Sequence, residues 1–448
     1  MLHYSYYPFK NDLEKIDGND LALLNDISEG WYIDYKSQGL KIVDYAKHIS
    51  AFANQYGGWL IIGVREKTDN SRTAGEFIGI DDVDKILTDL REAASSHVSP
   101  EILYEEKVVK GNIDEISLKE GKSIIIVGIP RSLNTPHIHS SGRIYRRLAD
   151  QSKPKEETDR FILDDLWERG QDHNKSIIEF LTDIPSLPNK ASKNKILHIF
   201  FKPNTAQASP QNILQFDEFA EIVTNQKNSV NGTHAPLTAI STAPHGYIAR
   251  QIEKNDPSSI CLTIRWWHNG SVRFDIPLNS YDFTSFEDIS GNYKYALEYL
   301  QQARKDGYTD IDIVDYSNMI QVVSALSNSY IHMLKKVNDK RDLFSCFTLR
   351  NIFHTSPFVD TKKFINKVSK YSLPITLEDK ISIPKKPTEN NMYRHFFNER
   401  IGFHGSESEQ HSYCYSFSAV VFLNILISVG LVNNYDDFVE DIEIYGFN

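Results

Sequence analysis

The chain is poor in cysteine and has no long apolar run. Its three cysteines, Cys261, Cys346 and Cys414, stand far apart in 448 residues, which argues against a disulfide framework and against a zinc ribbon. No stretch of about 18 apolar residues is present, which excludes a membrane span. The first residues lack a basic region followed by an apolar run, so a secretory signal is not indicated. These absences predict a protein of the reducing cytoplasm.

The chain also lacks an excess of positive charge. Lys and Arg total 49 against 60 Asp and Glu, a formal net charge of −11, which argues against a protein that coats DNA by bulk charge. A nucleic-acid partner would have to be held by a local basic cluster. Apolar residues make up 40% of the chain and charged residues 24%, as in proteins that bury a core. The length predicts roughly two to four domains of about 100–200 residues each.

Residues 20–170 carry the patterns of both helices and strands. The alternating aromatic and β-branched segment 31–36 predicts a strand. The apolar spacing of 40–56 predicts a helix, which a Gly-Gly pair ends. The continuous apolar run 59–64 predicts a buried strand. The other predicted elements are a helix at 82–95 and strands at 102–109, 123–129 and 143–146.

The rest of the chain divides by composition into a middle and a C-terminal part. The polar segment 151–156 predicts a loop, and the proline-bearing stretch 170–194 predicts a domain boundary. Asn269-Gly270 between two β-rich runs predicts a hairpin. Helices are predicted at 159–169, 174–181, 292–305 and 316–337, and residues 392–432 are expected to be mostly helical. The predicted fold class is α+β, with domains at 1–170, 171–290 and 291–448, the last mostly helical.

The segment around the first predicted strand carries the most chemistry. Glu29 comes just before this strand, and Asp34 and Lys36 lie on it two residues apart, so their side chains project from one face. Glu66 follows the predicted buried strand. If the two strands are neighbours in one sheet, three carboxylates and one amine converge at its end.

Such a cluster suits Mg²⁺ or Mn²⁺, which prefer carboxylate and water oxygens. A cation held by Glu29, Asp34 and Glu66 would neutralise charge on a phosphate under attack and activate a bound water. Lys36 would orient that water or stabilise the pentavalent phosphorus. This is the chemistry of a nuclease. The alternative interpretation is a set of solvated surface pairs, each worth about 0–1 kcal/mol.

A local basic patch lies near the end of the first predicted domain. Arg143, Arg146 and Arg147 fall within five residues beside Tyr145, a combination that can hold a phosphate backbone and stack a base. The alternative is a solvated edge strand whose charges block aggregation, and the sequence favours neither. Asn54, beside the Gly-Gly pair, is interpreted as a turn or capping residue.

Three strings of residues, in this order and spacing, resemble the Schlafen-type AlbA_2 domain. They are Glu29-x4-Asp34-x-Lys36, then Ala51-Phe52-Ala53-Asn54-x2-Gly57-Gly58-x-Leu60-x-Ile62-Gly63-Val64, and then Gly142-x2-Tyr145-x-Arg147 or Tyr145-Arg146. The resemblance covers about residues 20–155. It implies that Glu29, Asp34 and Glu66 match the catalytic acids of the vertebrate Schlafen tRNA-cleaving nucleases. Many bacterial members of the family are described instead as DNA- or nucleotide-binding regulators.

Two positions differ from the family pattern. Asp34 stands where glutamate is commoner, and Arg65 occupies the first position after the strand, where an acid is frequent. The tRNA-cleaving members pair two similar lobes into a horseshoe-shaped groove, and this sequence shows one such lobe. The resemblance therefore favours a homo-oligomer, a dimer or larger, that supplies the second lobe.

The leading functional hypothesis is a Mg²⁺- or Mn²⁺-dependent endoribonuclease that cleaves tRNA or another structured RNA. Arg143, Tyr145, Arg146 and Arg147 would bind the nucleic acid, with RNA favoured over DNA. Defence against phage would be a natural use of such an enzyme. The alternative is a non-catalytic DNA- or RNA-binding transcriptional regulator whose C-terminal part senses an effector, dimerises or binds a regulatory protein. A third interpretation is an interaction scaffold whose acids are only surface charge. No chemistry is assigned to residues 171–448.

Overall fold

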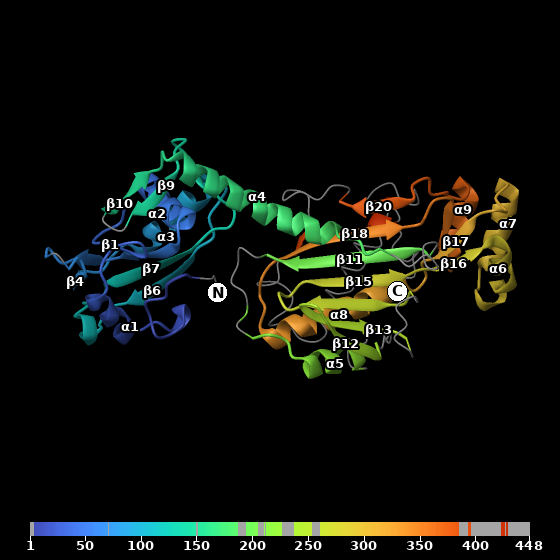
Figure 1. Ribbon diagram of the computed structural model, residues 1–448, viewed down its shortest axis with the longest axis horizontal. Coiled ribbons are helices and arrows are strands. Elements are labelled where there is room, and N and C mark those ends of the chain that lie inside the picture. The colour runs from blue at the N-terminus through green and yellow to red at the C-terminus, as the bar shows by residue number, and fades with distance from the viewer. Residues whose placement is uncertain are drawn as a thin grey trace. The chain divides into compact units, whose positions relative to one another are not determined.

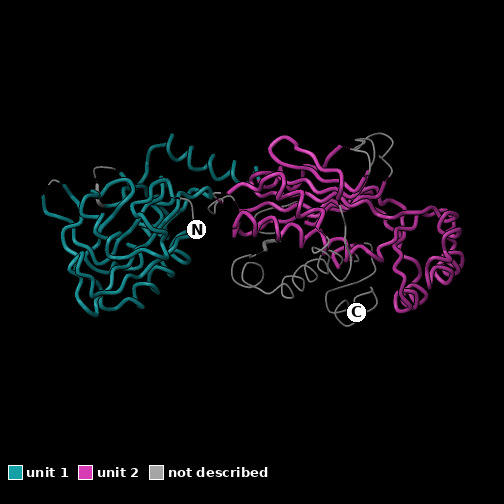
Figure 2. Tube along the Cα trace, turned by 90° about the horizontal axis from the view of Figure 1, so that it is seen from below, with its two compact units in different colours: residues 1–176, 205–209 teal, residues 177–204, 210–448 magenta. Residues whose placement is uncertain are grey.

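The chain divides into two compact units, which Figure 2 colours separately. Unit 1 comprises Met1–Ser176 and Thr205–Ser209, and unit 2 comprises Ile177–Asn204 and Pro210–Asn448. Both combine helices and sheets, which confirms the α+β class. The computed structural model describes residues 4–69, 71–148, 151–186, 194–204, 210, 212–225, 237–252, 260–384, 393–395, 423–425 and 427–428. None of the helices within these ranges is long and apolar enough to cross a membrane.

Unit 1 is built on a four-stranded sheet with the order β1-β2-β7-β6. β1 and β2 run parallel and are joined by α2, whereas the other neighbouring strands are antiparallel. This pairing confirms that the two strands flanking the first predicted helix are neighbours. The elements are β1 (Ile33–Lys36), β2 (Gly57–Ile62), β6 (Glu105–Lys110), β7 (Ser123–Pro130), α1 (Gly18–Ala22), α2 (Ile42–Asn54) and α3 (Val83–Ser96).

Two hydrophobic cores cover the two faces of this sheet. Successive side chains of a strand point to opposite faces, so Trp59 and Ile61 of β2 pack against the N-terminal segment, whereas Leu60 and Ile62 pack against α2 and α3. Every residue of β2 is therefore buried. This double burial explains the continuous apolar run in the sequence.

Three two-stranded pairs accompany the central sheet. They are β3 (Val64–Glu66) with β4 (Ala74–Phe77), β5 (Val98–Ser99) with β8 (Ile138–His139), and β9 (Tyr145–Leu148) with β10 (Gln151–Glu156). The prediction of a loop at 151–156 is wrong, because these residues pair with β9. The register shifts between Gln151 and Lys155, and Pro154, which has no N–H to donate, falls within that irregularity.

One long helix, α4 (Arg160–Thr182), replaces the two shorter helices predicted at 159–169 and 174–181. Gly170 lies inside this helix, and a Cβ there would come 2.0 Å from the carbonyl oxygen of Thr135. This glycine therefore allows a close approach of two backbone segments and does not end the helix. The boundary between the two units falls within α4, inside the predicted boundary region.

Unit 2 contains an antiparallel eight-stranded sheet with the order β12-β13-β14-β15-β11-β18-β20, in which β21 also pairs with β18 (Figure 1). A smaller sheet has the order β16-β17-β19. The strands of unit 2 are β11 (Ile196–Pro203), β12 (Ala239–Ala243), β13 (Gly246–Arg250), β14 (Thr263–Trp267), β15 (Val272–Pro277), β16 (Asn279–Asp282), β17 (Asp312–Asp315), β18 (Leu343–Arg350), β19 (Thr355–Phe358), β20 (Lys380–Ile383) and β21 (Tyr393–His395).

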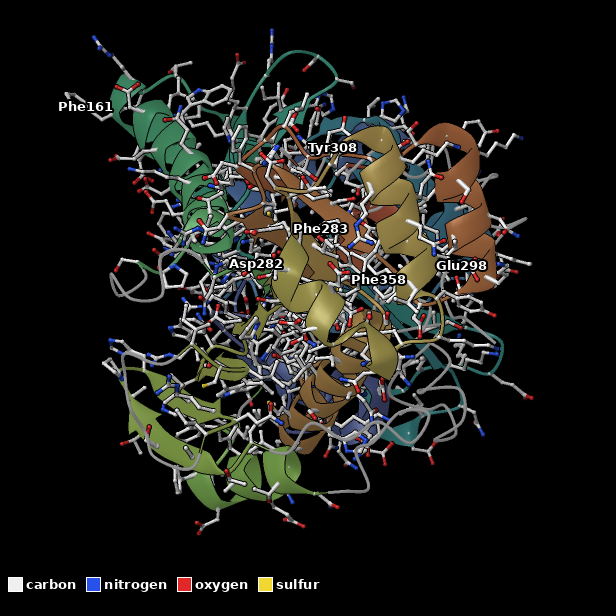
Figure 3. All side chains as sticks on the ribbon, turned by 90° about the vertical axis from the view of Figure 1, so that its right-hand side faces the viewer. Phe161, Asp282, Phe283, Glu298, Tyr308 and Phe358 are labelled. Carbon is white, nitrogen blue, oxygen red and sulfur yellow. The ribbon has the colours of Figure 1, made fainter. Side chains whose placement is uncertain are left out.

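Helices accompany these sheets within the described ranges. They are α5 (Phe216–Thr224), α6 (Phe283–Asp288), α7 (Ala296–Asp306), α8 (Met319–Val337) and α9 (Lys362–Tyr371). Figure 3 looks onto the end of unit 2, where Asp282 and Phe283 mark the start of α6 and Glu298 lies on α7. Phe358 packs there against Phe286, with ring centroids 5.0 Å apart.

The hairpin predicted around Asn269-Gly270 is confirmed by the pairing of β14 with β15. The prediction that residues 291–448 form a separate, mostly helical domain is wrong for the described residues. That part supplies β17 to β21, and β18 pairs with β11 along its whole length of 8 residues. A boundary at residue 290 would therefore cut one sheet. Most of the predicted helical segment 392–432 lies outside the described residues.

Candidate functional site

The predicted acidic cluster is set up by β1 and the parallel strand β2 beside it. Alternation along β1 turns Ile33 and Tyr35 toward the core on the N-terminal side of the sheet, so Asp34 and Lys36 face α2. Asp34 lies opposite Leu60 of β2 in the register of the sheet. A carboxylate thus stands in an otherwise apolar layer, where it must find basic partners.

Asp34 is completely buried and contacts three basic side chains. Its Oδ1 accepts a hydrogen bond from Nζ of Lys36, and its Oδ2 lies 2.6 Å from Nδ1 of His48 and 2.9 Å from Nη1 of Arg147. Burial alone would raise the pKa of this carboxyl, but His48, Arg147 and Lys36 outweigh burial and hold the pKa well below its usual range. Asp34 is therefore ionised, and it holds these three groups in place.

His48 lies on α2 with its side chain 8% exposed. Burial lowers the pKa of His48, and this effect outweighs the opposing influence of Asp34. The imidazole is therefore biased toward its neutral form, in which one ring nitrogen can accept a proton.

Glu29 lies beside Asp34 and carries the opposite charge bias. Its Oε1 accepts a hydrogen bond of 2.7 Å from the backbone N–H of Tyr35, and its Oε2 accepts one of 3.0 Å from Arg72. Burial, followed by the charge of Asp34, raises the pKa of Glu29 to about 8. Two neighbouring carboxyl groups cannot both ionise without cost. Glu29 therefore holds a proton near neutral pH while Asp34 does not.

Among the described residues, Arg72 is the one that links Glu66 to the cluster. After β2, Gly63 with a φ of +100° turns the chain, so β3 pairs with β4 and does not continue the central sheet. The side chain of Glu66 is 42% exposed, and its Oε2 lies 3.8 Å from Nε of Arg72. Arg72 stands between Glu29 and Glu66, which are therefore not joined directly.

These positions do not fit the predicted Mg²⁺ or Mn²⁺ site as the side chains stand. Basic groups contact all three carboxylates of Glu29, Asp34 and Glu66. Within the described ranges, no three His, Cys, Asp or Glu side chains are grouped so that they could hold a metal ion. Binding a cation would require Lys36 and Arg72 to move away, and the metal requirement stays a prediction.

Two residues of the predicted nucleic-acid patch are internal, which corrects that prediction. Arg147 has no exposed surface, and it donates to Asp34 and to the carbonyl oxygens of Gly30 and Ile33. Its guanidinium also lies 5.0 Å from the ring centroid of Phe52. Arg147 cannot touch a phosphate from this position. It is a positioning residue for Asp34.

Tyr145 is likewise buried, and its ring packs edge-on against His139 at 5.5 Å. It is not placed to stack a base. Arg143, with a side chain 57% exposed, lies 3.0 Å from Glu156, and Arg146 forms an ion pair with Glu157. Nucleic-acid binding by these two arginines stays a prediction, and a phosphate would have to compete with their glutamate partners.

The sequence pattern did not point to two residues of the site, His48 and Arg72. For a third residue, Asn54, it suggested a role that the structure does not bear out. His48 falls beside the apolar stripe of α2, and Arg72 lies in the turn between β3 and β4 with no periodic signal. Asn54 is not a turn residue. Its buried side chain donates to the carbonyl oxygens of His137 and Tyr145 and accepts from the N–H of His137. Asn54 thus anchors the segment that carries Arg147.

Comparisons with known proteins find a family in the N-terminal part of the chain. The Schlafen AlbA_2 family profile matches residues 29–156. The N-terminal domain of a RecG-related protein from Nitrosomonas europaea is similar, at 21% identity over 32% of this chain and 96% of that chain, with a TM-score of 0.23. The DIP2311 protein from Corynebacterium diphtheriae is similar at 18% identity over 33% of this chain, with a TM-score of 0.21, and the match covers 26% of its own length. No curated protein matches the chain. The family match, together with the βαβ unit and its acidic pair, identifies residues 29–156 as a Schlafen AlbA_2 domain.

Proposed function

We propose that this protein binds nucleic acid through its Schlafen AlbA_2 domain, favours RNA over DNA, and cleaves tRNA or another structured RNA beside Asp34. The observation that supports this proposal most directly is the pair Glu29 and Asp34, two buried carboxyl groups with opposite charge bias. Burying a charged group costs roughly several kcal/mol per ion before any ion pair forms. Strongly perturbed carboxyl groups of this kind are typical of functional sites.

Two of the basic groups around this pair, Lys36 and Arg72, are partly exposed and can be reached by a phosphate. The side chains of Lys36 and Arg72 are 18% and 30% exposed, whereas Asp34 is not exposed at all. Fixed cations can stabilise the charge that develops on a phosphodiester under attack. Asp34 and Glu29 hold these cations in position, and we assign no step to a divalent cation because the acids are not placed to bind one.

Cleavage is tested with total tRNA and the full-length protein, in parallel with Mn²⁺, with Mg²⁺ and with EDTA. We expect discrete fragments from the wild type and their loss in Lys36→Ala and Asp34→Asn. Lys47→Ala is the matched control, because Lys47 is a lysine whose ion-pair partner is Asp44 of α2 and not Asp34. Circular dichroism shows whether each variant is folded. Fragments that persist equally in Lys36→Ala would contradict the proposal, as would intact tRNA under all three conditions.

A non-catalytic nucleic-acid-binding regulator is the second candidate. It is favoured by the contacts of Glu29, Asp34 and Glu66 with basic side chains, since paired acids of this kind can serve stability alone. A regulator would shift tRNA or DNA in a gel without cutting it, and Arg146→Ala would weaken the shift while Asp34→Asn would not. A scaffold would give neither a shift nor fragments.

The proposed nuclease would also need a second lobe to form a groove around RNA. A homodimer can supply it, and sedimentation velocity of the full-length protein with and without tRNA would show whether one forms. A role in phage defence belongs to the same proposal. It predicts that cells producing the wild type, but not Lys36→Ala, survive infection better.

A further inference from the structure

The eight-stranded sheet of unit 2 has one apolar face and one face rich in basic side chains. Phe201, Phe274 and Trp266 belong to the apolar face, where Phe201 and Phe274 pack against Tyr330 of α8. Alternation sends the intervening side chains to the other face. On that face β11 carries His198 and Lys202, β14 carries Arg265 and Trp267, and β15 carries Arg273 and Asp275.

The last turns of α4 cover only part of this second face. Ile177 and Leu181 form a small core with Phe200, Phe344 and Cys346 of β11 and β18. Phe180 packs edge-on against Trp267, with ring centroids 5.0 Å apart. The basic side chains of β14 and β15 lie next to this covered area and are partly exposed.

Arg265 and Arg273 occupy directly opposite positions on the two neighbouring strands. Both guanidinium groups lie over the ring of Trp267, at 5.1 Å and 6.0 Å from its centroid. Like charges opposite each other destabilise a sheet, and the indole face compensates only in part. Burial, together with the charge of Arg273, lowers the pKa of Arg265, as expected for two cations held close together.

Within the described residues, most of the donors of these two arginines have no acceptor. Arg273 donates through Nε to Asp275, which also lies 2.7 Å from Nδ1 of His198. Arg265 donates through Nη2 to the carbonyl oxygen of Pro244, while its buried Nε meets no acceptor in that same part of the chain. Among the described carboxylates, Asp275 is the one paired with either arginine. The pair therefore carries a surplus positive charge and N–H groups that an anion can reach.

We propose that Arg265 and Arg273 bind phosphate groups of a single-stranded nucleic acid, at a site separate from the AlbA_2 domain. Arginine presents a planar set of donors that matches a phosphate in bidentate geometry. Basic and aromatic side chains together on one face are typical of surfaces that bind single strands. The proposal does not depend on cleavage by unit 1, and it gives unit 2 a direct part in substrate binding.

The experiment uses chemical modification of arginine. Its readout identifies individual arginine residues, so RNA bound to unit 1 does not obscure the result for Arg265 and Arg273. The full-length protein is treated with phenylglyoxal, alone or with a single-stranded RNA of about 20 nucleotides, ATP or inorganic phosphate, and peptides are analysed by mass spectrometry. We expect RNA to slow modification of Arg265 and Arg273 about tenfold, as for a charge-assisted bidentate contact. Arg304 is the matched control, because it lies 5.4 Å from the ring centroid of Phe283 and pairs with Glu287.

Variants provide a second, independent measurement. The double variant Arg265→Gln/Arg273→Gln should bind the RNA more weakly, and the slope of its salt dependence should fall by about 0.7 for each phosphate that the variant no longer binds. Arg304→Gln should bind as the wild type does. Protection by ATP but not by RNA would overturn the single-strand assignment and point to a free nucleotide at the same phosphate site. Modification that no probe slows, with unchanged binding by the double variant, would overturn the site altogether.

Discussion

Arg147 in unit 1 and Arg265 in unit 2 put the same side chain to opposite uses. Arg147 is fully buried and donates to one carboxylate and two carbonyl oxygens. Arg265 is partly exposed, faces another arginine and donates to the carbonyl oxygen of Pro244. An arginine holds other groups in position when its N–H donors are satisfied within the fold. An arginine whose donors lack acceptors, and which lies beside a like charge, is available to bind an anion. The number of satisfied donors therefore distinguishes the two roles better than sequence context does.

Replacing Arg147 should produce the largest effect and tests the first half of this comparison. Arg147→Ala leaves the Asp34 carboxylate and two carbonyl oxygens buried without this donor, so we expect a loss of about 3–5 kcal/mol in the free energy of unfolding of unit 1. Urea unfolding monitored by circular dichroism measures it. Arg265→Ala should change stability by less than about 0.5 kcal/mol. Equal losses in the two variants would refute the comparison.

Asp34, which pairs with Arg147, and Asp275, which pairs with Arg273, the residue opposite Arg265, should differ in the same direction. Asp34→Asn leaves Lys36 and Arg147 without their charged partner inside the protein, and we expect a loss of roughly 3 kcal/mol. The side chain of Asp275 is 15% exposed, so solvent screens its contacts, and Asp275→Asn should cost roughly 1 kcal/mol or less. Thermal unfolding of both variants at one salt concentration provides the measurement. A larger loss of stability for Asp275→Asn than for Asp34→Asn would show that burial does not determine how much each aspartate stabilises the protein.

Glu29 should make the free energy of unfolding depend on pH. Neither Arg265 nor Arg273 should cause such a dependence. An unfolded glutamate releases its proton near pH 4.5 and Glu29 in the folded protein near 8. Between these values the folded state binds more protons, so the free energy of unfolding falls as the pH rises from 4.5 to 8. Asp34 acts oppositely, because its lowered pKa removes stability only as the pH falls below 3.8.

The matched variant for this pH effect is Glu29→Gln, which resembles the protonated side chain. We expect it to unfold with a free energy close to that of the wild type at about pH 5 and to lack the decline toward about pH 8. Urea titrations at closely spaced pH values supply the two curves. Parallel curves for wild type and variant would show that Glu29 is ionised in the folded protein.

The smallest effects should come from the two arginines that flank Tyr145. Arg143→Ala and Arg146→Ala each remove one candidate phosphate contact that already has a glutamate partner. We expect each to weaken tRNA binding by a factor of about 2–5 and to reduce the salt slope by about 1 or less. Fluorescence anisotropy across a salt series measures both quantities. A reduction in binding as large as that of the Arg265 and Arg273 double variant would show that Arg143 and Arg146 contribute as much to RNA binding as the pair in unit 2 does.

Local patterns in the chain were sufficient to predict much of the fold. The alternation at 31–36, the helical spacing after it and the apolar run 59–64 together describe the βαβ unit that forms. The turn signal at Asn269-Gly270 predicts its hairpin because a short loop with a glycine in the left-handed region, here Gly270 with a φ of +87°, suffices to close it. The failures are non-local. Gln151–Glu156 is a strand only because β9 lies beside it, and β18 joins a sheet whose strand β11 comes far earlier in the chain.

The candidate site likewise combines residues that local sequence patterns predict with residues that only the fold brings together. Residue type and spacing along one strand identified Glu29, Asp34 and Lys36, since alternation places Asp34 and Lys36 on one face wherever that strand is built. The partners that set their charge states, His48, Arg72 and Arg147, come from a helix, a turn and a strand up to 113 residues away. Whether an acid binds a cation from solution or a basic side chain depends on which groups packing brings within about 3 Å. The assembled fold determines that distance, and no local sequence pattern predicts it.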